Sequence, residues 1–342
     1  MADRERSGKP LIPPVLFAGI VRTEPMARIY SPEEWITRFH KTRGKRRSTV
    51  VTIGNFDGVH LGHQAILRHT QELGVAFEGM SVAVTFYPHP AKILRPAEAP
   101  PLLMTLDQRL DAIEALGIEA AFVLKFDDSL ARMDAREFVR NYLKDTLRTS
   151  SVVYGENFRF GYQNAGDAST LYDMGIDLYP CPQVELDGTV VSSSAIRGAL
   201  RDGKVDDARR MLGRPFSLAG KVQTGTGQGS KLVVPTLNLA TEQELLPKNG
   251  VYATEAVVGG EVYRAATNVG VRPTFDGSRT TIESHLLDFS QTLKTGDLEV
   301  RFWARLRDER KFSSPAELRE QVFRDIDQAR EYFHSPVRNP ST

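Results

Sequence analysis

Two different hydrophobic patterns divide the chain. From Ser48 onward, short β-branched runs alternate with segments whose apolar residues recur every three or four positions. This alternation is typical of buried parallel strands joined by helices. The expected strands span 48–53, 80–86, 120–124 and 151–154, and the expected helices between them span 60–73, 106–116 and 134–147. The pattern predicts a doubly wound α/β domain that binds ligands beyond the carboxyl ends of its strands.

The pattern changes after two short helical segments at 194–201 and 205–212. From Ser217 onward, β-branched and aromatic runs are separated by Gly, Asn and Pro, which is typical of antiparallel strands joined by turns. Five or six such strands followed by one helix predict a small antiparallel β-barrel with a terminal helix packed against it. The expected divisions are a disordered leader over 1–27, an α/β domain over 28–213 and a barrel domain over 214–335.

The last helix can be delimited from the sequence. Its apolar stripe recurs at helical spacing and consists of Leu318, Val322, Ile326, Ala329 and Phe333. Ser314 is expected to cap the first turn, Pro315 suits the first helical position, and Glu317 is spaced to complete a capping box. The stripe is the face that we expect to pack against the barrel.

Composition and charge exclude several classes of protein. The 342 residues include 44 Lys and Arg against 43 Asp and Glu, a formal net charge of +1, whereas duplex-binding domains usually have a clustered basic excess. Cys181 is the only cysteine, so neither an internal disulfide nor a cysteine metal cluster can form. No apolar run reaches the roughly 20 residues that span a bilayer. We expect a cytoplasmic monomer or weak homo-oligomer that binds neither nucleic acid nor membranes.

The stretch GNFDGVHLGH joins the first expected strand to the first expected helix. Its glycines let the backbone approach a ligand closely, and the amides at a helix start form an anion site. His60 and His63 are three residues apart, so on a helix they share one face and can both reach a phosphate over its first turn. The candidate nucleotide ligands of this stretch are Gly54, Asn55, Asp57 and Gly58, with His60 and His63 as the groups that stabilise charge during transfer.

Taken alone, this stretch could also be a glycine-rich turn with two surface histidines. A zinc site is the weaker alternative, because only two histidines are present and no third ligand is indicated. The order of strand, glycines, His-x-Gly-His and helix favours the nucleotide site over both.

The same stretch resembles the HxGH signature of nucleotidyltransferases, in the form found in bacterial FAD synthetases, which are two-domain riboflavin kinase/FMN adenylyltransferases. TFYPHP, YGENFRFG and VSSSAIR match this family in the same order, and the resemblance extends from about Ile29 to Arg330. Read without the family, Asn157 is equally a turn residue, and VSSSAIR is more simply an N-cap followed by an exposed arginine. The resemblance implies that Asn157 contacts nucleotide and that Ser193, Ser194 and Arg197 bind the ATP phosphates.

A second group of candidates lies at the start of the barrel domain, in GTGQGSKLVVPTLN. No helix follows its glycines, so they do not fit a dinucleotide-binding turn. Thr236 and Asn238 are two apart on an extended segment, so they point the same way and offer a hydroxyl and an amide oxygen to a hard cation such as Mg²⁺. Glu283 lies on an alternating strand, where a carboxylate can accept the proton of a substrate hydroxyl. Taken alone, these are more often turn caps and an exposed strand position.

Resemblance to the riboflavin kinase domain of the same family implies that Glu283 is the catalytic base and that Thr236 and Asn238 hold Mg-ATP. The further candidates in this domain are Gly225 and Gly227 for nucleotide and Arg307 and Glu309 for flavin. The chain departs from the family at Val233 and Val234, where Gly-Phe is usual, and at Leu237, where alanine is usual. Loss of a flexible glycine is expected to restrict the loop that closes on nucleotide. The departures therefore count against kinase activity more than against adenylyl transfer.

The sequence thus predicts a bifunctional flavin-nucleotide enzyme that uses ATP, Mg²⁺ and flavins. The barrel would phosphorylate riboflavin to FMN, and the α/β domain would transfer the adenylyl group of ATP to FMN, giving FAD and pyrophosphate. Three alternatives stay open: an adenylyltransferase with an inactive flavin-binding barrel, a non-catalytic flavin sensor, and a nucleotidyltransferase for a pantetheine or nicotinamide nucleotide.

Overall fold

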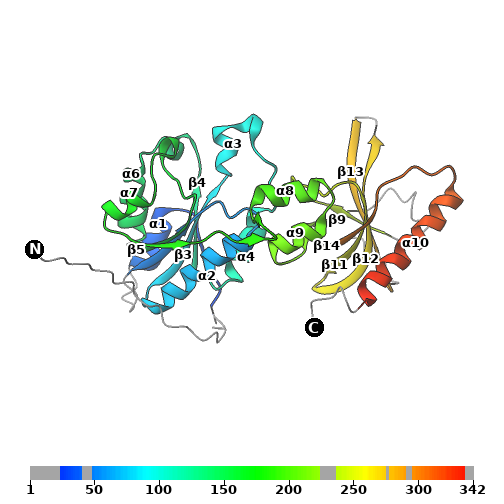
Figure 1. The fold of residues 1–342 in the computed structure, drawn as a ribbon, viewed down its shortest axis with the longest axis horizontal. Coiled ribbons are helices and arrows are strands. Elements are labelled where there is room, and N and C mark those ends of the chain that lie inside the picture. Colours follow the sequence, from blue (N-terminus) through cyan, green and yellow to red (C-terminus); the bar gives the residue numbers. More distant parts are fainter. Residues whose placement is uncertain (1–23, 41–47, 224–235, 275–276, 290–294, 336–342) are drawn as a thin grey trace, which may run out of the picture.

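The computed structural model describes residues 24–40, 48–223, 236–274, 277–289 and 295–335. Figure 1 shows a parallel-sheet domain and a barrel domain with two helices between them. Most of the expected leader, residues 1–23, lies outside the described residues. Its last residues do not belong to a leader: Met26 is buried and its amide donates to Glu114 Oε1 at 3.0 Å, and Ala27 begins the first strand. The α/β domain therefore includes these two residues.

The first domain is built on a six-stranded parallel sheet, ordered β1-β4-β3-β2-β5-β6. Its strands are β1 (Ala27–Ile29), β2 (Thr49–Ile53), β3 (Met80–Tyr87), β4 (Ala120–Lys125), β5 (Thr149–Gly155) and β6 (Asp177–Cys181). The four expected strands are confirmed. The sequence missed β1, which is only three residues long, and β6, which is interrupted by Pro180 and carries little apolar patterning. The strand order reverses between β2 and β5, so their carboxyl ends form the crevice in which such sheets bind ligands.

Helices cover both faces of this sheet. They are α1 (Pro32–Trp35), η1 (Ile36–His40), α2 (Leu61–Ala76), α3 (Pro90–Leu94), η2 (Pro96–Glu98), α4 (Leu106–Glu114), α5 (Asp128–Ala131), α6 (Ala135–Phe138), η3 (Val139–Thr146), η4 (Tyr162–Asn164) and α7 (Ala168–Asp173). The expected helix over 134–147 is instead a short α-helix, α6, that continues as the π-helical η3. Its apolar positions Val139, Leu143 and Leu147 are nevertheless buried, so the predicted face was correct.

Alternate strand residues pack on opposite faces of the sheet. Ala83 and Ala121 pack with Leu67 of α2 and Leu110 of α4. Val51 and its neighbours pack on the other side with residues of α1, α6, η3 and α7. Burial of both faces explains why the strands read as almost continuous apolar runs.

Two helices connect the domains, α8 (Ser193–Arg201) and α9 (Val205–Leu212), preceded by the hairpin of β7 (Glu185–Leu186) and β8 (Thr189–Val190). Both helices were expected from the sequence. Their buried residues Ile196, Leu200 and Val205 belong to the same apolar cluster as Phe216 and Leu218 of the barrel. The boundary expected at residue 213 thus separates these helices from much of the core into which they pack.

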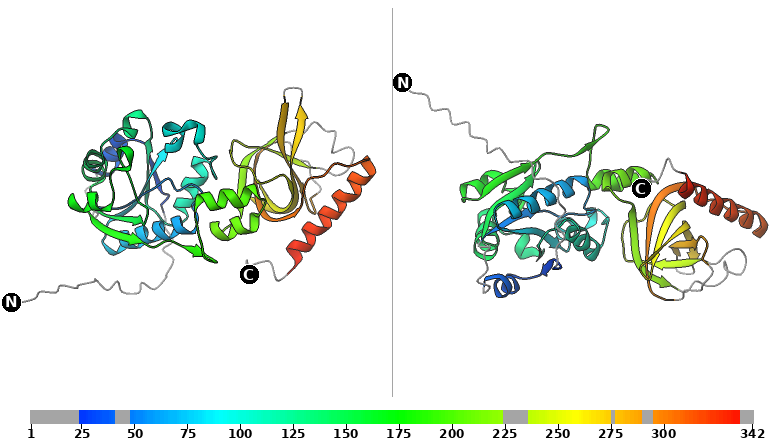
Figure 2. Two further views of the ribbon diagram at one scale, coloured as in Figure 1. Left: turned by 45° about the horizontal axis from the view of Figure 1, so that its top comes forward. Right: turned by 90° about the horizontal axis from the view of Figure 1, so that it is seen from below.

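The second domain is a closed six-stranded antiparallel barrel, ordered β10-β13-β12-β11-β14-β9. Its elements are β9 (Phe216–Gln223), β10 (Leu237–Ala240), β11 (Gly250–Val258), β12 (Glu261–Thr274), β13 (Gly277–Leu286), β14 (Asp297–Arg307) and the terminal helix α10 (Pro315–His334). Figure 2 shows from two further directions that α10 lies against the outside of the barrel. The fold class predicted from the sequence is therefore confirmed for both domains.

The terminal helix packs as its stripe predicted. Ile326, Ala329 and Phe333 are buried against Trp303 of β14. Ser314 is the N-cap and accepts the Glu317 amide at 3.2 Å, as expected. The capping box differs, because the Glu317 carboxylate accepts the amide of Ser313 at 3.0 Å rather than that of Ser314. Within the described residues, no helix is both long and apolar enough to cross a membrane.

Candidate functional site

A strained turn brings the GNFDGVHLGH stretch to the carboxyl edge of the sheet. Phe56, Gly58 and Val59 have positive φ angles of 49°, 88° and 40°. At Gly58 a side chain would also be crowded, since an added Cβ would lie 2.7 Å from Leu103 Cδ1. Such backbone strain persists only where the surroundings enforce it, and it is common at ligand sites. The turn delivers His60 to the start of α2, beside the end of β2.

The two histidines of this turn form a stacked pair. Their ring centroids are 3.7 Å apart with an interplanar angle of 20°, which confirms that they share one face. His60 caps α2, and its Nδ1 accepts the His63 amide at 3.3 Å. A Cβ on Gly62 would lie 3.2 Å from the His60 ring, so the glycine leaves room for this arrangement.

Both histidines are neutral at neutral pH. Burial lowers the pKa of His60 to about 4, and the positive charge of Arg214 acts in the same direction. Burial also lowers the pKa of His63 well below its usual range, aided by His60 and Arg109. A neutral imidazole can donate one hydrogen bond, and an approaching polyphosphate would raise both pKa values. The pair is thus suited to stabilise phosphate charge without carrying a charge of its own beforehand.

Two motifs that are far apart in the sequence meet behind the turn. Arg197 Nη2 and Asp57 Oδ2 form a buried ion pair at 2.5 Å, and Arg197 Nε donates to the Pro101 carbonyl at 2.8 Å. Both Asp57 oxygens also accept the Leu103 amide, at 3.0 and 3.1 Å. Burial raises the pKa of Asp57 against the opposing effects of that amide and of Arg197. Asp57 and Arg197 therefore support the turn from behind.

The serines of VSSSAIR lie against the same turn. Ser193 Oγ donates to the Asp57 carbonyl at 2.8 Å, and Ser192 caps α8 by accepting the Ala195 amide at 3.2 Å. Ser194, at the start of α8, is exposed. The structure thus brings together the two stretches that the sequence assigned to one nucleotide site.

Arg109 is a site residue that the sequence analysis did not find. It is buried, and its Nη1 donates to the Asn55 carbonyl at 2.6 Å and to Thr85 Oγ1 at 3.3 Å. Its Nε has no hydrogen-bond partner among the described residues. The signal was an arginine on the apolar face of α4, beside Leu110 and Ile113, where a buried charge needs a specific partner.

A pocket of about 450 Å³ opens next to the turn, at the reversal point of the sheet. Gly54 and Asn55 line one side of it, and Asn157, which follows β5, lines another. Most of the remaining lining is aromatic or aliphatic, including Phe86 and Phe158. Apolar pockets of this size with a few polar groups are typical of small-molecule sites. Asn157 is thus placed beside the candidates in the Gly54–His63 turn.

The candidates in the barrel lie in one row across three strands. Glu283 of β13 pairs directly with Asn238 of β10 on one side and with Asn268 of β12 on the other. Directly paired residues have side chains on the same face, so these three groups are neighbours. Ile282 and Ser284 are buried in the barrel whereas Glu283 is only half-buried, so the row is on the outer face. Asn268 was not found by the sequence analysis.

Thr236 immediately precedes β10, two residues before Asn238. The hydroxyl, amide and carboxylate oxygens of Thr236, Asn238 and Glu283 are hard ligands of the kind that suit Mg²⁺. The other two nucleotide candidates of this domain, Gly225 and Gly227, lie outside the described residues, as do Val233 and Val234. Leu237, the third departure from the family pattern, is buried in the barrel core and does not face this row.

Arg307 and Glu309 have different surroundings. Arg307 forms a bidentate ion pair with Asp325 of α10, at 2.8 and 2.6 Å, and so joins β14 to the terminal helix. A Cβ on Gly270 would lie 2.4 Å from Glu309 Oε1 and 3.1 Å from the side-chain nitrogen of Asn268. Glu309 therefore lies at the end of the outer-face row, whereas Arg307 is held by the helix.

The fold and the two sites define a two-domain transferase: a nucleotidyltransferase-type α/β domain and a kinase-type barrel. Family models agree with this division, since FAD synthetase matches residues 42–195 and riboflavin kinase matches residues 212–333. The chain is 37% identical to the bifunctional riboflavin kinase/FMN adenylyltransferase of Pseudomonas fluorescens, over 85% of this chain and 95% of that protein. It is 34% identical to that of Bacillus subtilis, over 86% and 95%. The chain belongs to the family of bifunctional riboflavin kinases/FMN adenylyltransferases, as the sequence predicted.

A solved structure resembles both domains together. It is described as a macrolide-efflux protein from Streptococcus pneumoniae, with 28% identity and a TM-score of 0.80, covering 90% of this chain and 100% of that chain. The similarity extends to the two-domain arrangement, and the efflux described for that protein is not carried over to this chain.

Proposed function

We propose that this chain converts riboflavin to FMN at the outer face of its barrel, with ATP as the donor of the γ-phosphoryl group. It would convert FMN to FAD at the Gly54–His63 turn, with ATP as the donor of the adenylyl group. The observation that carries the proposal is that each domain assembles its candidate residues from separate stretches of sequence. The Gly54–His63 turn meets VSSSAIR and Asn157, and Glu283 is flanked by Asn238 and Asn268.

In adenylyl transfer, a phosphate oxygen of FMN attacks the α-phosphorus of ATP, and the bond to pyrophosphate breaks. His60 and His63 donate hydrogen bonds to the phosphates as negative charge moves toward the leaving group. The start of α8 with Ser193 and Ser194 offers further donors. Arg197 acts through Asp57, because their buried ion pair keeps the turn in place; direct contact of Arg197 with phosphate stays a prediction.

The apolar pocket of about 450 Å³ beside Gly54 is the place that we assign to the flavin ring. Phe86 and Phe158 offer flat apolar surfaces for it, and Asn157 offers both a donor and an acceptor. A ring held there would place the flavin phosphate near the histidine pair. The aromatic lining of this pocket suits the flat ring of a flavin.

In the kinase step, Glu283 accepts the proton of the ribityl hydroxyl while that oxygen attacks the γ-phosphorus of ATP, and ADP leaves. Asn238 and Asn268 flank Glu283 and orient it and the nucleotide. Thr236 and Asn238 are the residues that would hold Mg²⁺, which shields the phosphate charges from the incoming nucleophile. Glu309 lies at the end of the row, beside Gly270. The flavin contacts of Glu309 and Arg307 both stay predictions.

The direct test is incubation of the purified chain with riboflavin, ATP and Mg²⁺, followed by chromatographic separation of the flavins. We expect both FMN and FAD to form. FAD from supplied FMN but nothing from riboflavin would support the alternative of an inactive barrel, for which the departures at Val233 and Val234 are the reason. Binding of flavin without turnover would support the sensor. The cytoplasmic location and the monomeric or weakly oligomeric state also stay predictions.

The Glu283→Gln variant tests the base separately. It removes the proton acceptor without changing side-chain size, so FMN formation from riboflavin should fall by about 100-fold or more, within the range typical of general-base catalysis. Conversion of FMN to FAD should be unchanged, because the histidine pair is in the other domain. Glu255→Gln on β11 is the matched control and should keep both activities. Kinase activity that survives in Glu283→Gln would show that another group is the base.

A further inference from the structure

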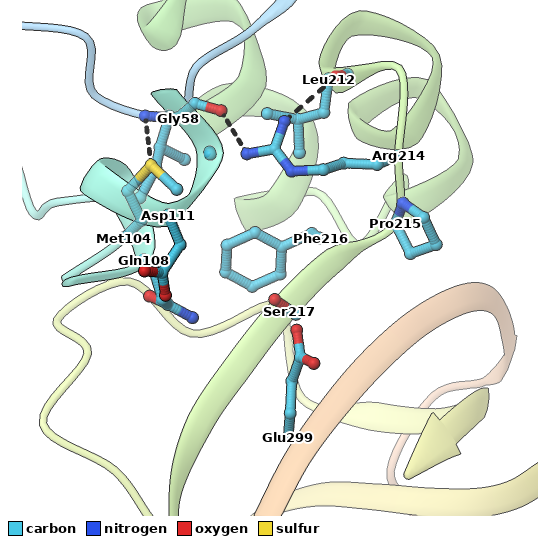
Figure 3. A pocket seen from close by; sticks show the side chains of 12 residues that line it. Gly58, Met104, Gln108, Asp111, Leu212, Arg214, Pro215, Phe216, Ser217 and Glu299 are labelled. Carbon is cyan, nitrogen blue, oxygen red and sulfur yellow. Dashed lines mark hydrogen bonds between the residues drawn. The ribbon is translucent and has the colours of Figure 1, made fainter. Parts of the chain in front are cut away.

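Arg214 joins the two domains at the back of the nucleotide turn (Figure 3). It comes just after α9, and the barrel begins two residues later at Phe216. Its Nη2 donates to the Gly58 carbonyl at 2.7 Å, and its Nη1 donates to the carbonyls of Val59 at 3.0 Å and Leu212 at 3.2 Å. A side chain of the interdomain segment thus binds two consecutive carbonyls of the turn that precedes His60.

Two of these carbonyls belong to Gly58 and Val59, which both have positive φ, and this conformation is strained at Val59. Gln64 of α2 donates to the same carbonyls of Val59 and Leu212, at 2.9 and 2.7 Å. Arg214 and Gln64 therefore cross-link the end of α9 to the turn. The strain needs such external hydrogen bonds, because non-glycine residues at positive φ are unfavourable on their own.

The partly buried, charged environment of Arg214 strengthens its hydrogen bonds to the turn. It lines a cavity of about 270 Å³ between the domains, together with Gly58, Phe216 and Glu299. Burial lowers the pKa of Arg214, partly offset by the negative charge of Glu299. Hydrogen bonds from a charged donor are stronger than those between neutral groups. The guanidinium is thus held at the turn by charged hydrogen bonds, beside a cavity that is also lined by the first strand of the barrel.

We propose that Arg214 is a positioning residue for adenylyl transfer: by holding the carbonyls of Gly58 and Val59 it places His60 for the phosphates, and it makes that placement depend on the docked barrel. The proposal rests on the adenylyltransferase function proposed above. It predicts an effect on the chemical step rather than on substrate binding, since Arg214 touches the turn from behind. A displacement of a catalytic group by about 1 Å is enough to cost roughly 100-fold in rate.

The experiment measures kcat and KM for the conversion of FMN to FAD in the full chain, with formation of FMN from riboflavin as an internal check of folding. Arg214→Met removes the hydrogen-bond donors of the guanidinium but keeps the apolar part of the side chain. Arg214→Lys keeps the positive charge and a single donating nitrogen. Arg210→Met is the matched control, because Arg210 is an exposed arginine on α9 that pairs with Asp187 and does not touch the turn.

Arg214→Met should lower kcat for FAD formation by about 10- to 100-fold, the equivalent of losing one or two charged hydrogen bonds, with KM for ATP changed by less than about 3-fold. Arg214→Lys should recover part of this loss. Arg210→Met, and the kinase activity of all variants, should stay within about 2-fold of the parent, the spread of an ordinary surface substitution.

Two results would overturn the proposal. The first is an unchanged kcat in Arg214→Met, and the second is an equal loss of both activities together with a lower melting temperature, which would make Arg214 a general structural residue. If the parent chain itself forms no FAD from supplied FMN, the proposed function fails first, and the positioning role fails with it.

Discussion

Asp57 and Arg197 form a contact with each other that the sequence analysis did not predict. From the sequence, Asp57 was a nucleotide ligand and Arg197 a phosphate-binding cation. The two residues are 140 positions apart in the sequence, but in the structure they form a buried ion pair. Each therefore compensates the charge of the other, and the pair supports the turn from behind. Direct contact of either residue with nucleotide stays a prediction.

Asp57→Asn should destabilise the protein strongly, because it leaves the Arg197 guanidinium buried beside a neutral group. Loss of one partner of a buried pair typically costs about 3–5 kcal/mol of the free energy of unfolding. Urea denaturation of both proteins measures the difference. Asp187→Asn is the control, since its ion pair with Arg210 is exposed and should contribute about 1 kcal/mol or less. A loss below about 1 kcal/mol in Asp57→Asn would contradict a supporting role.

The low pKa of His60 makes stability depend on pH. Its folded pKa of about 4 lies below the ordinary 6.5, so the unfolded chain binds the proton more readily between these values. The contribution is complete above pH 6.5 and is lost as the pH falls toward 4. At pH 5 we expect it to amount to about 1–2 kcal/mol of lost stability. Urea titrations at pH 7.5 and 5 should show a smaller loss in His60→Asn than in the parent, and equal losses would contradict the prediction.

At the scale of single elements, local sequence signals were accurate. The N-cap at Ser314, the stripe on α10 and the alternation along β13 all appear where the sequence placed them. These signals act over three or four residues, so nearby backbone geometry is enough to specify them. The same rule explains the error over 134–147, where the apolar spacing was correct but a π-helical stretch replaced regular α-helix.

Ser314→Ala tests the strength of such a local signal. It removes the oxygen that accepts the Glu317 amide at 3.2 Å, and N-cap losses of this kind cost about 1 kcal/mol. Thermal or urea denaturation, followed through the unfolding transition of the barrel domain, should show this loss in the free energy of unfolding. Ser335→Ala at the other end of α10 is the control and should change stability by less than about 0.5 kcal/mol. An unchanged unfolding transition in Ser314→Ala would mean that packing alone holds the helix start.

At the scale of the whole molecule, the connecting helices decide how the domains depend on each other. The apolar residues of α8 and α9 share one cluster with the interior of the barrel. The matched family models end at residue 195 and begin again at residue 212, so this helix pair falls largely between them. The helix pair nevertheless packs against the core of the barrel and stabilises it.

A pair of truncated chains tests this dependence. A fragment over 189–335 keeps α8 and α9 and should melt at a higher temperature than a fragment over 214–335, which exposes the apolar surface that these helices cover. For a domain of this size, a loss of even 1 kcal/mol lowers the melting temperature by about 3–4 °C. Differential scanning calorimetry measures both. Equal melting temperatures would show that the helix pair contributes nothing to the barrel.

The sequence by itself determined most of the elements, the two fold classes, the family and the stretches that carry the candidate site residues. Periodicity, caps and motifs are local, so they can be read without knowing what packs against them. Only the tertiary structure decided that Arg197 pairs with Asp57, that Arg109 holds Asn55, that Asn268 flanks Glu283, and that Arg214 supports Gly58. Each of these contacts joins residues that are distant in the chain, and its energy comes from burial and from partners that exist only after the elements have packed.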